Sequence, residues 1–134
     1  MDIDAGPVVQ VRGLTMAFGD DVIQQDLDFD IRRGEVLAIV GASGCGKSTL
    51  LRHLIGLAVP AAGQVLYGEQ DLNQCDDDTL GQLRRRFGVL FQSGALWSSM
   101  SVGDNVMLPL RLFTPLGAAE RQQRARWKLA LVGL

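Results

Sequence analysis

The segment that most constrains this chain is a glycine-rich stretch that matches the pattern G-x-x-x-x-G-K-[ST]. Its residues are Gly41, Ala42, Ser43, Gly44, Cys45, Gly46, Lys47 and Ser48. The preceding residues 36–40 form an apolar run of strand length, and residues 47–57 carry leucines at helical spacing. A strand, a glycine loop and a helix in this order predict a phosphate-binding loop.

Each part of this loop has a physical role in holding a phosphorylated ligand. Glycines leave the backbone free to curl around a phosphate, because no Cβ blocks the required dihedral angles. Successive N–H groups then point inward, and the following helix adds free amides and the positive end of its dipole. Lys47 is predicted to reach the β- and γ-phosphates, and the Ser48 hydroxyl to bind Mg²⁺.

The composition excludes several classes of protein. A chain of 134 residues can form one domain with a core. Its net charge of −2 gives no general attraction to nucleic acid, so nucleic acid is not expected as a partner. Two cysteines suit a reducing cytosol. The acidic N-terminus is unlike a signal peptide, and no apolar stretch approaches the roughly 18 residues of a membrane span. Any role at a membrane is therefore expected from one side of it.

The residues before the loop are predicted to form an antiparallel ribbon. Residues 8–16 alternate loosely between apolar and polar, and residues 22–31 alternate well, with an acidic solvated face. A short connection then leads into the strand expected at 36–40. Beyond the loop helix, the predicted elements are a strand at 64–67, a helix at 79–86, a strand at 87–91, a helix after Ser101 that Pro109 bends or ends, and a helix at 116–131.

Two groups that could suggest chemistry have simpler interpretations. The acids at 76–78 precede the helix at 79–86, where they are expected to cap it and to suit its dipole rather than to bind a metal. His53 is the only histidine. It is expected to be an ordinary surface or boundary residue, because a single histidine without a partner makes neither a triad nor a metal site.

Gln92 lies at the end of the strand predicted at 87–91. In open α/β sheets, ligands bind at the carboxyl ends of strands. Gln92 and the loop that follows Val40 are therefore expected to meet in space.

Other classes of phosphate-loop protein fit less well. A GTPase needs a D-x-x-G element followed later by N-K-x-D. Residues 78–81 match the first and residues 73–76 half-match the second, but their order is reversed, their spacing is too tight and Gln74 replaces the lysine. A small-molecule kinase could use the arginines at 84–86 in a lid, but it would not explain the ribbon before the loop or Gln92.

From residue 8 to residue 134 the pattern resembles the ATP-binding subunit of ABC transporters. The resemblance implies an α/β P-loop NTPase core of RecA type with an N-terminal antiparallel β subdomain. The β subdomain and core would cover about residues 8–92, and the Q-loop and the start of the helical subdomain about residues 92–134. It also implies that Phe18 stacks on adenine, that Thr49 continues the phosphate loop, and that Gln92 contacts Mg²⁺ and the attacking water.

Three shorter stretches resemble a narrower group, the Mla-type phospholipid-trafficking ATPases. They are residues 90–96, residues 100–102 with 104–106, and the pair Pro109-Leu110. The resemblance implies ATP and Mg²⁺ as cofactors and a second nucleotide-binding subunit in a head-to-tail dimer. It further implies a membrane permease contacted near the Q-loop, a lipid-binding periplasmic component, and a place on the cytoplasmic face of the inner membrane.

The later motifs of the family do not occur in this sequence. It has no L-S-G-G signature, no apolar run ending in Asp-Glu and no switch histidine. We therefore expect the N-terminal part of such a subunit, ending within the helical subdomain, which binds ATP weakly and hydrolyses it negligibly by itself. The alternatives are another P-loop protein, such as a kinase or a non-transport ABC ATPase, or a nucleotide-binding module without catalysis.

Overall fold

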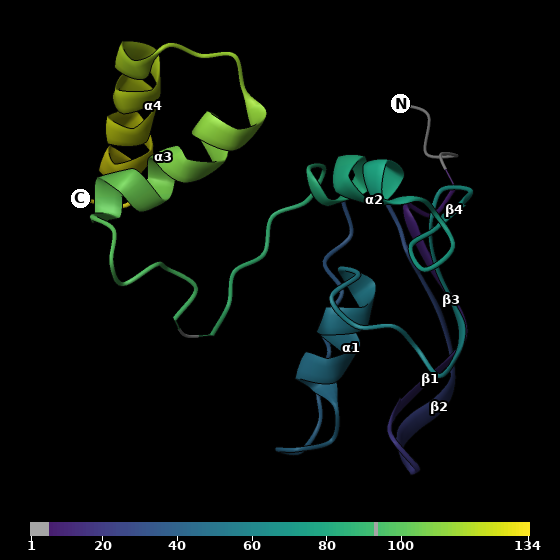
Figure 1. Cartoon of the computed structure of the whole chain (residues 1–134). Coiled ribbons are helices and arrows are strands. Elements are labelled where there is room, and N and C mark those ends of the chain that lie inside the picture. Colours follow the sequence, from purple (N-terminus) through teal and green to yellow (C-terminus); the bar gives the residue numbers. More distant parts are fainter. Residues whose placement is uncertain (1–5, 93) are drawn as a thin grey trace. The chain divides into compact units, whose positions relative to one another are not determined.

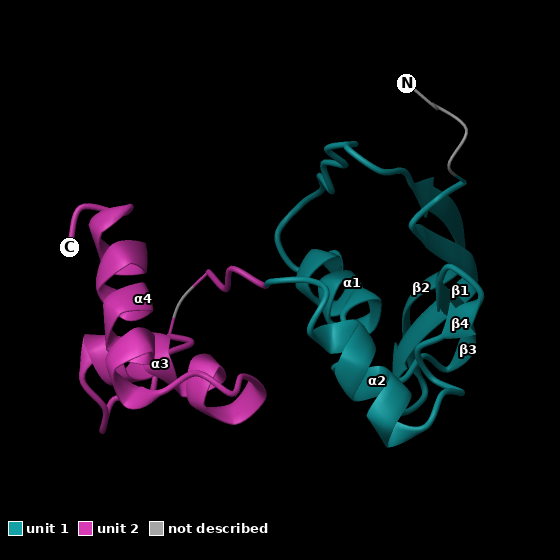
Figure 2. Ribbon diagram, turned by 90° about the horizontal axis from the view of Figure 1, so that it is seen from above, with its two compact units in different colours: residues 1–88 teal, residues 89–134 magenta. Residues whose placement is uncertain are grey.

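The computed structural model describes residues 6–92 and 94–134, which divide into two compact units at Gly88 and Val89. The first unit contains an antiparallel sheet and two helices, and the second is helical (Figure 1; Figure 2). The division falls a few residues before Gln92, so this glutamine belongs to the second unit.

The sheet of the first unit has the strand order β2-β1-β3-β4, and every pairing is antiparallel. Its strands are β1 (Val9–Phe18), β2 (Asp21–Ile31), β3 (Ala62–Tyr67) and β4 (Gln70–Asp71). The predicted ribbon is thus confirmed, and so is the alternation of β2, whose Leu27, Phe29 and Ile31 are half-buried while the intervening aspartates are exposed.

A bulge explains why β1 alternates only loosely. Val9 and Val11 are buried, and then the buried positions shift to Leu14 and Met16, where the pairing with β2 also shifts register. Gly13 adopts a positive φ of 54° between them. One extra residue in a strand moves the following side chains to the other face, so a strict period of two cannot describe such a strand.

Helices α1 (Lys47–Leu54) and α2 (Asp77–Arg84) lie on the same side of this sheet (Figure 2). Leu50 and Leu54 of α1 and Leu83 of α2 join Val11 and Val65 of the strands in one buried core. Asp76 caps α2 by accepting a hydrogen bond from the Thr79 backbone N–H at 2.8 Å, which confirms the capping interpretation of the acids at 76–78.

Two strand predictions are wrong. Residues 36–40 and 87–91 are not strands. Residues 36–40 are exposed, with Val36 at 94%, whereas the second run is mixed: Leu90 is 97% exposed, and Phe87 and Val89 are half-buried. An apolar run supplies the side chains for a buried strand, but a strand also needs a neighbour to share its backbone hydrogen bonds. Neither run pairs with any of the described strands.

The prediction for His53 is also wrong, because the imidazole is buried, with 3% of the residue exposed. Its Nδ1 donates to the Thr49 carbonyl oxygen at 2.8 Å, one turn earlier in α1. The residue follows Leu50 by three positions and precedes Leu54, so it shares the face of the helix that enters the core. This hydrogen bond within the helix lowers the free-energy cost of burying the imidazole.

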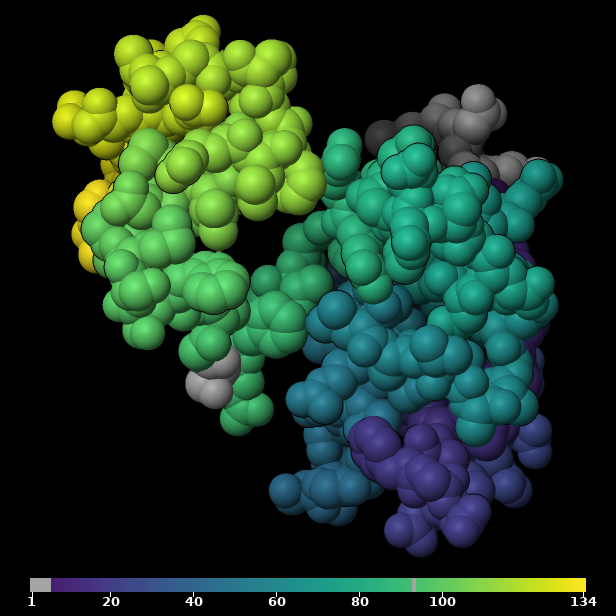
Figure 3. All heavy atoms as spheres, viewed as in Figure 1, coloured from purple at the N-terminus to yellow at the C-terminus, as the bar shows by residue number. Residues whose placement is uncertain are grey.

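The second unit is a pair of packed helices, α3 (Val102–Phe113) and α4 (Ala118–Ala130). Ser101 caps α3, accepting from the Asp104 N–H at 3.1 Å and donating to the Asp104 carboxylate at 2.5 Å. The helix continues through Pro109, so this proline does not end it. Most side chains of α4 are exposed on the surface of the unit (Figure 3).

Candidate phosphate-binding site

The backbone of residues 41–46 has the curled form that a phosphate loop requires. Gly44 and Gly46 have positive φ values of 82° and 101°, which an L-amino acid rarely adopts. Gly46 is the N-cap of α1, and no side chain caps this helix. The N–H groups of the first turn of α1 therefore have no partner within the helix and are available to an anion.

Gly41 is needed for a different reason, which is space. A Cβ placed on Gly41 would lie 2.6 Å from the Sγ atom of Cys45, far closer than carbon and sulfur approach each other without bonding. The two ends of the loop are thus folded against each other through the Cys45 thiol. The sequence pattern identifies both residues, but only the structure shows this contact.

The Lys47 side chain turns back over the loop. Its Nζ donates to the carbonyl oxygens of Gly41 at 2.8 Å and Ala42 at 2.7 Å, and lies 3.8 Å from the Cys45 sulfur. The ammonium group is therefore held at the centre of the loop by backbone oxygens. A cation in this position favours a polyanionic ligand above the same loop.

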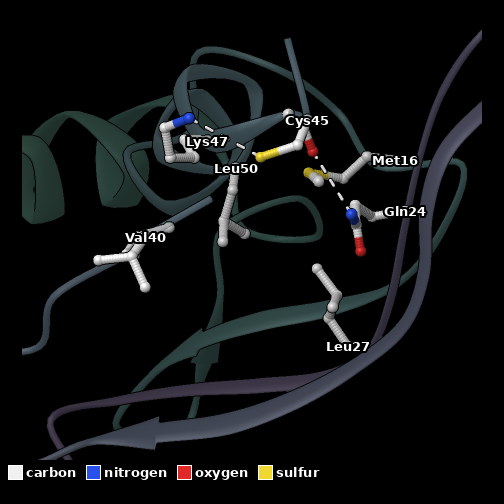
Figure 4. Close-up of a pocket in the computed structure, with 9 residues that line it drawn as sticks. Met16, Gln24, Leu27, Val40, Cys45, Lys47 and Leu50 are labelled. Carbon is white, nitrogen blue, oxygen red and sulfur yellow. Dashed lines mark hydrogen bonds between the residues drawn. The ribbon is translucent and has the colours of Figure 1, made fainter. Parts of the chain in front are cut away.

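An apolar cavity of about 190 Å³ lies between the loop and the sheet. Figure 4 shows Met16, Leu27 and Leu50 around it, and Gln24 beside it donating to the Cys45 carbonyl oxygen at 3.4 Å. The remaining lining residues are Ile39, Val40, Cys45, Gly46 and Lys47. The sheet thus supports the loop through Gln24 and Leu27 of β2 and Met16 of β1.

The far end of α1 is held by side chains that the sequence did not identify. The Tyr67 hydroxyl donates to the Leu54 carbonyl oxygen at 2.8 Å, and the Arg84 guanidinium donates to that of Gly56. Burial raises the pKa of Tyr67, and its ring stacks on Phe87 at a centroid distance of 5.5 Å. Because the last carbonyls of a helix lack partners within it, these two donors fix the end of the helix whose start carries Lys47 and Ser48.

The remaining predicted site residues are found in three places. Ser48 and Thr49 follow Lys47 in the first turn of α1. Phe18 ends β1 opposite Asp21 and is 61% exposed, so its ring is open to solvent in the same unit as the loop. Gln92 is exposed in the second unit, and its meeting with the loop stays a prediction.

The segment after Gln92 is organised by Asn105 of α3. The Asn105 carboxamide accepts from the Trp97 N–H at 2.8 Å and donates to the carbonyl oxygens of Trp97, Met100 and Ser101 at 3.0 to 3.3 Å. A single side chain thus ties residues 97–101 to α3. In the sequence, Asn105 belongs to a short stretch that resembles the Mla-type ATPases, and that resemblance does not predict such a network.

The loop residues fit a nucleoside triphosphate. Positive-φ glycines, free helix amides and a central ammonium all suit a polyphosphate, and the Ser48 hydroxyl is an oxygen ligand of the kind Mg²⁺ binds together with phosphate. Across residues 6–92 and 94–134, no group of three or more His, Cys, Asp or Glu residues could hold a metal ion.

Comparison with known proteins identifies the class. Residues 24–134 match the family model described as ABC transporter. The chain belongs to this family, and with it to the P-loop NTPases. Of solved structures, the chain resembles the ATP-binding cassette MJ0796, in a dimeric post-hydrolysis state bound to ADP and phosphate, with a TM-score of 0.84 and 31% identity. That alignment covers 94% of this chain and 57% of the other.

Two curated relatives are described as ATP-binding proteins of transport systems. The probable ribonucleotide transport ATP-binding protein Mkl of Mycobacterium leprae is 43% identical over 129 residues, 96% of this chain and 37% of the relative. The intermembrane phospholipid transport system ATP-binding protein MlaF of Haemophilus influenzae is 39% identical over 127 residues, 95% of this chain and 48% of the relative. The chain therefore spans between a third and a half of the length of these relatives.

Helices that are long and apolar enough to cross a membrane are absent from the described part of the chain.

Proposed function

We propose that this chain binds ATP and Mg²⁺ through residues 41–49 and serves as the ATP-binding part of an ABC transporter. The loop amides and Lys47 hold the phosphates, Ser48 and Gln92 hold Mg²⁺, and Phe18 stacks on adenine. Bound Mg²⁺ would supply charge neutralisation at the phosphates. Gln92 would also orient the attacking water.

The observation that carries this proposal is the position of the Lys47 ammonium. It lies against the carbonyl oxygens of Gly41 and Ala42, at the N-terminus of a helix that no side chain caps. The backbone N–H groups of the loop and helix and the Lys47 ammonium all present positive charge to the ligand. They therefore bind a polyphosphate more strongly than a neutral ligand.

Hydrolysis is proposed to need more than these residues. Phosphoryl transfer depends on positioning and on charge stabilisation around the attacking water. The 134 residues contain no apolar run ending in Asp-Glu that would supply a general base. We expect the chain alone to bind ATP weakly and to hydrolyse it negligibly, with turnover in a head-to-tail dimer of complete nucleotide-binding subunits beneath a permease, at the cytoplasmic face of the membrane.

The cargo is proposed to be phospholipid or a similar apolar molecule. Two observations support this choice, the stretch at residues 90–96 and the 39% identity to MlaF, which is described as part of an intermembrane phospholipid transport system. The 43% identity to Mkl, described as a probable ribonucleotide transporter, supports ribonucleotides as a second candidate. A permease gene and a periplasmic lipid-binding protein gene beside this one would support phospholipid, and a nucleoside-binding protein gene would contradict it.

Titration of the 134-residue chain with a fluorescent ATP analogue tests the nucleotide site. Lys47→Ala should weaken binding at least tenfold, because a charge-assisted hydrogen bond to phosphate contributes about 1.5–3 kcal/mol. Lys128→Ala removes the same charge from α4 and is the matched control, which should bind like the original chain. Equal affinity of the original chain and Lys47→Ala would contradict the proposal, and so would sustained Mg²⁺-dependent turnover by the chain alone.

A further inference from the structure

The net charge of −2 is the sum of a negative charge on the first unit and a positive charge on the second. Residues 89–134 contain five arginines and lysines and two acids, whereas residues 1–88 contain eight and thirteen. The helical unit is therefore basic and the unit with the phosphate loop is acidic. Four of the five basic residues of the helical unit lie on one helix, α4, at positions 121, 124, 126 and 128.

The outward face of α4 combines these charges with large apolar side chains. Ala125 is the buried residue of this helix. At a rotation of 100° per residue, Arg124, Trp127 and Leu131 form a stripe on the other side. Trp127 is 58% and Leu131 62% exposed, and the Lys128 ammonium lies 4.7 Å from the centre of the Trp127 ring. Residues 124–131 have the colours at the yellow end of the bar in Figure 3.

This combination matches the boundary between water and lipid, where apolar and basic side chains occur side by side on one helix. Tryptophan has an apolar ring and a polar N–H, so it is favoured where one end is dry and the other wet. Arginine and lysine bury their stems along an apolar surface and keep their charges in the headgroup layer. An amphipathic helix with basic residues beside Trp and Leu is typical of segments that lie in a membrane interface.

We propose that the outward face of α4, formed by Arg124, Trp127, Lys128 and Leu131, lies against the anionic phospholipid headgroups of a membrane surface. Charge complementarity is the reason for choosing anionic lipid, since each arginine or lysine near such a surface strengthens partitioning roughly fivefold. This contact needs neither ATP nor a permease, so it goes beyond the proposed transport function.

The fluorescence of Trp127 can test this contact directly. The chain has two tryptophans, so Trp97→Phe leaves Trp127 as the only one. The full 134-residue chain with this change is mixed with vesicles of phosphatidylglycerol and phosphatidylcholine, or of phosphatidylcholine alone. The expected result is a blue shift of Trp127 emission and sedimentation with the anionic vesicles only, both reversed by high salt, which screens the attraction.

Two double variants distinguish a specific face from general charge. Arg124→Gln with Lys128→Gln should weaken partitioning into anionic vesicles roughly tenfold or more, with helix content unchanged by circular dichroism. Arg32→Gln with Arg33→Gln makes the same change in net charge at an exposed turn of the other unit and should leave partitioning unchanged.

Three results of the vesicle experiments would each overturn the proposal. They are no blue shift with anionic vesicles, an equal shift with phosphatidylcholine alone, and an equal loss in the control double variant. Binding to polyglutamate without binding to vesicles would also overturn it and would indicate an acidic protein partner. The ATP titration does not depend on these outcomes. A negative result with vesicles would therefore not contradict the proposed nucleotide site.

Discussion

Replacing Gly41 by alanine tests whether the phosphate loop is held by the contact between its two ends. The new Cβ would lie 2.6 Å from Cys45 Sγ but 4.0 Å from Cys45 Cβ, so the conflict is with the sulfur atom alone. The Gly41 carbonyl also accepts from Lys47, so moving residue 41 displaces the ammonium. We therefore expect Gly41→Ala to weaken ATP binding.

The magnitude follows from the size of the overlap. Extra methyl groups in a tightly packed site cost about 1–3 kcal/mol. The sulfur can turn about a single bond, which places the cost at about 1–2 kcal/mol, or roughly a 5- to 30-fold rise in Kd for ATP. Cys45→Ala removes the sulfur and leaves an ordinary contact at 4.0 Å, so the double variant Gly41→Ala with Cys45→Ala should regain the affinity of Cys45→Ala.

A double-mutant cycle measured by ATP-analogue fluorescence checks this reasoning. The four chains are the original, each single variant and the double variant, and the coupling between the two changes is the quantity of interest. Gly44→Ala is a useful comparison, because a Cβ there meets nothing within 4 Å and only the positive φ of 82° opposes it. A Gly41→Ala defect that persists in the double variant would refute the steric explanation, as would the absence of any defect in the single variant.

Two further predictions concern the elements around α1. Tyr67→Phe removes the hydrogen bond to the Leu54 carbonyl oxygen and should lower the free energy of unfolding by about 1 kcal/mol in urea titrations. Burial raises the pKa of Tyr67, so its contribution to the free energy of unfolding is present below pH 10 and is lost as the pH rises through the higher folded pKa. Tyr67→Phe should therefore make the free energy of unfolding less dependent on pH in this alkaline range. The hydrogen bonds from Thr79 lower the pKa of Asp76 below its usual 3.8, so the cap stabilises α2 above that value and is lost as the pH falls through the folded pKa. Asp76→Asn keeps an acceptor for the cap and should reduce the acid dependence of thermal unfolding, and an unchanged profile would contradict the assignment.

Parts of the fold were predictable because they depend on local patterns. The alternation of β2 places its apolar side chains on one face, and the acids at 76–78 offer an oxygen to the free amides of the next helix. Both signals act over a few residues, so the sequence contains all of their cause. The phosphate loop belongs to the same class, because positive φ at Gly44 and Gly46 is a property of glycine itself.

The failures arose where a distant partner decides the outcome. Residues 36–40 are as apolar as a buried strand, but a strand needs a neighbour along its length, and a run of side chains cannot specify one. His53 is polar by type, but it shares the face of α1 on which Leu50 and Leu54 pack into a core with residues of distant strands. The bulge at Gly13 moved half of β1 to the other register, which no fixed period anticipates.

The sequence by itself thus determined the chemistry of this protein: a glycine loop, a lysine and a hydroxyl in the order that binds a phosphorylated ligand. Only the tertiary structure decided how that loop is held, through the Cys45 sulfur against Gly41, the Gln24 amide on the Cys45 carbonyl and Tyr67 at the far end of α1. The physical reason is range. Backbone freedom and side-chain charge belong to single residues, whereas close contact and support depend on residues that folding brings together from distant parts of the chain.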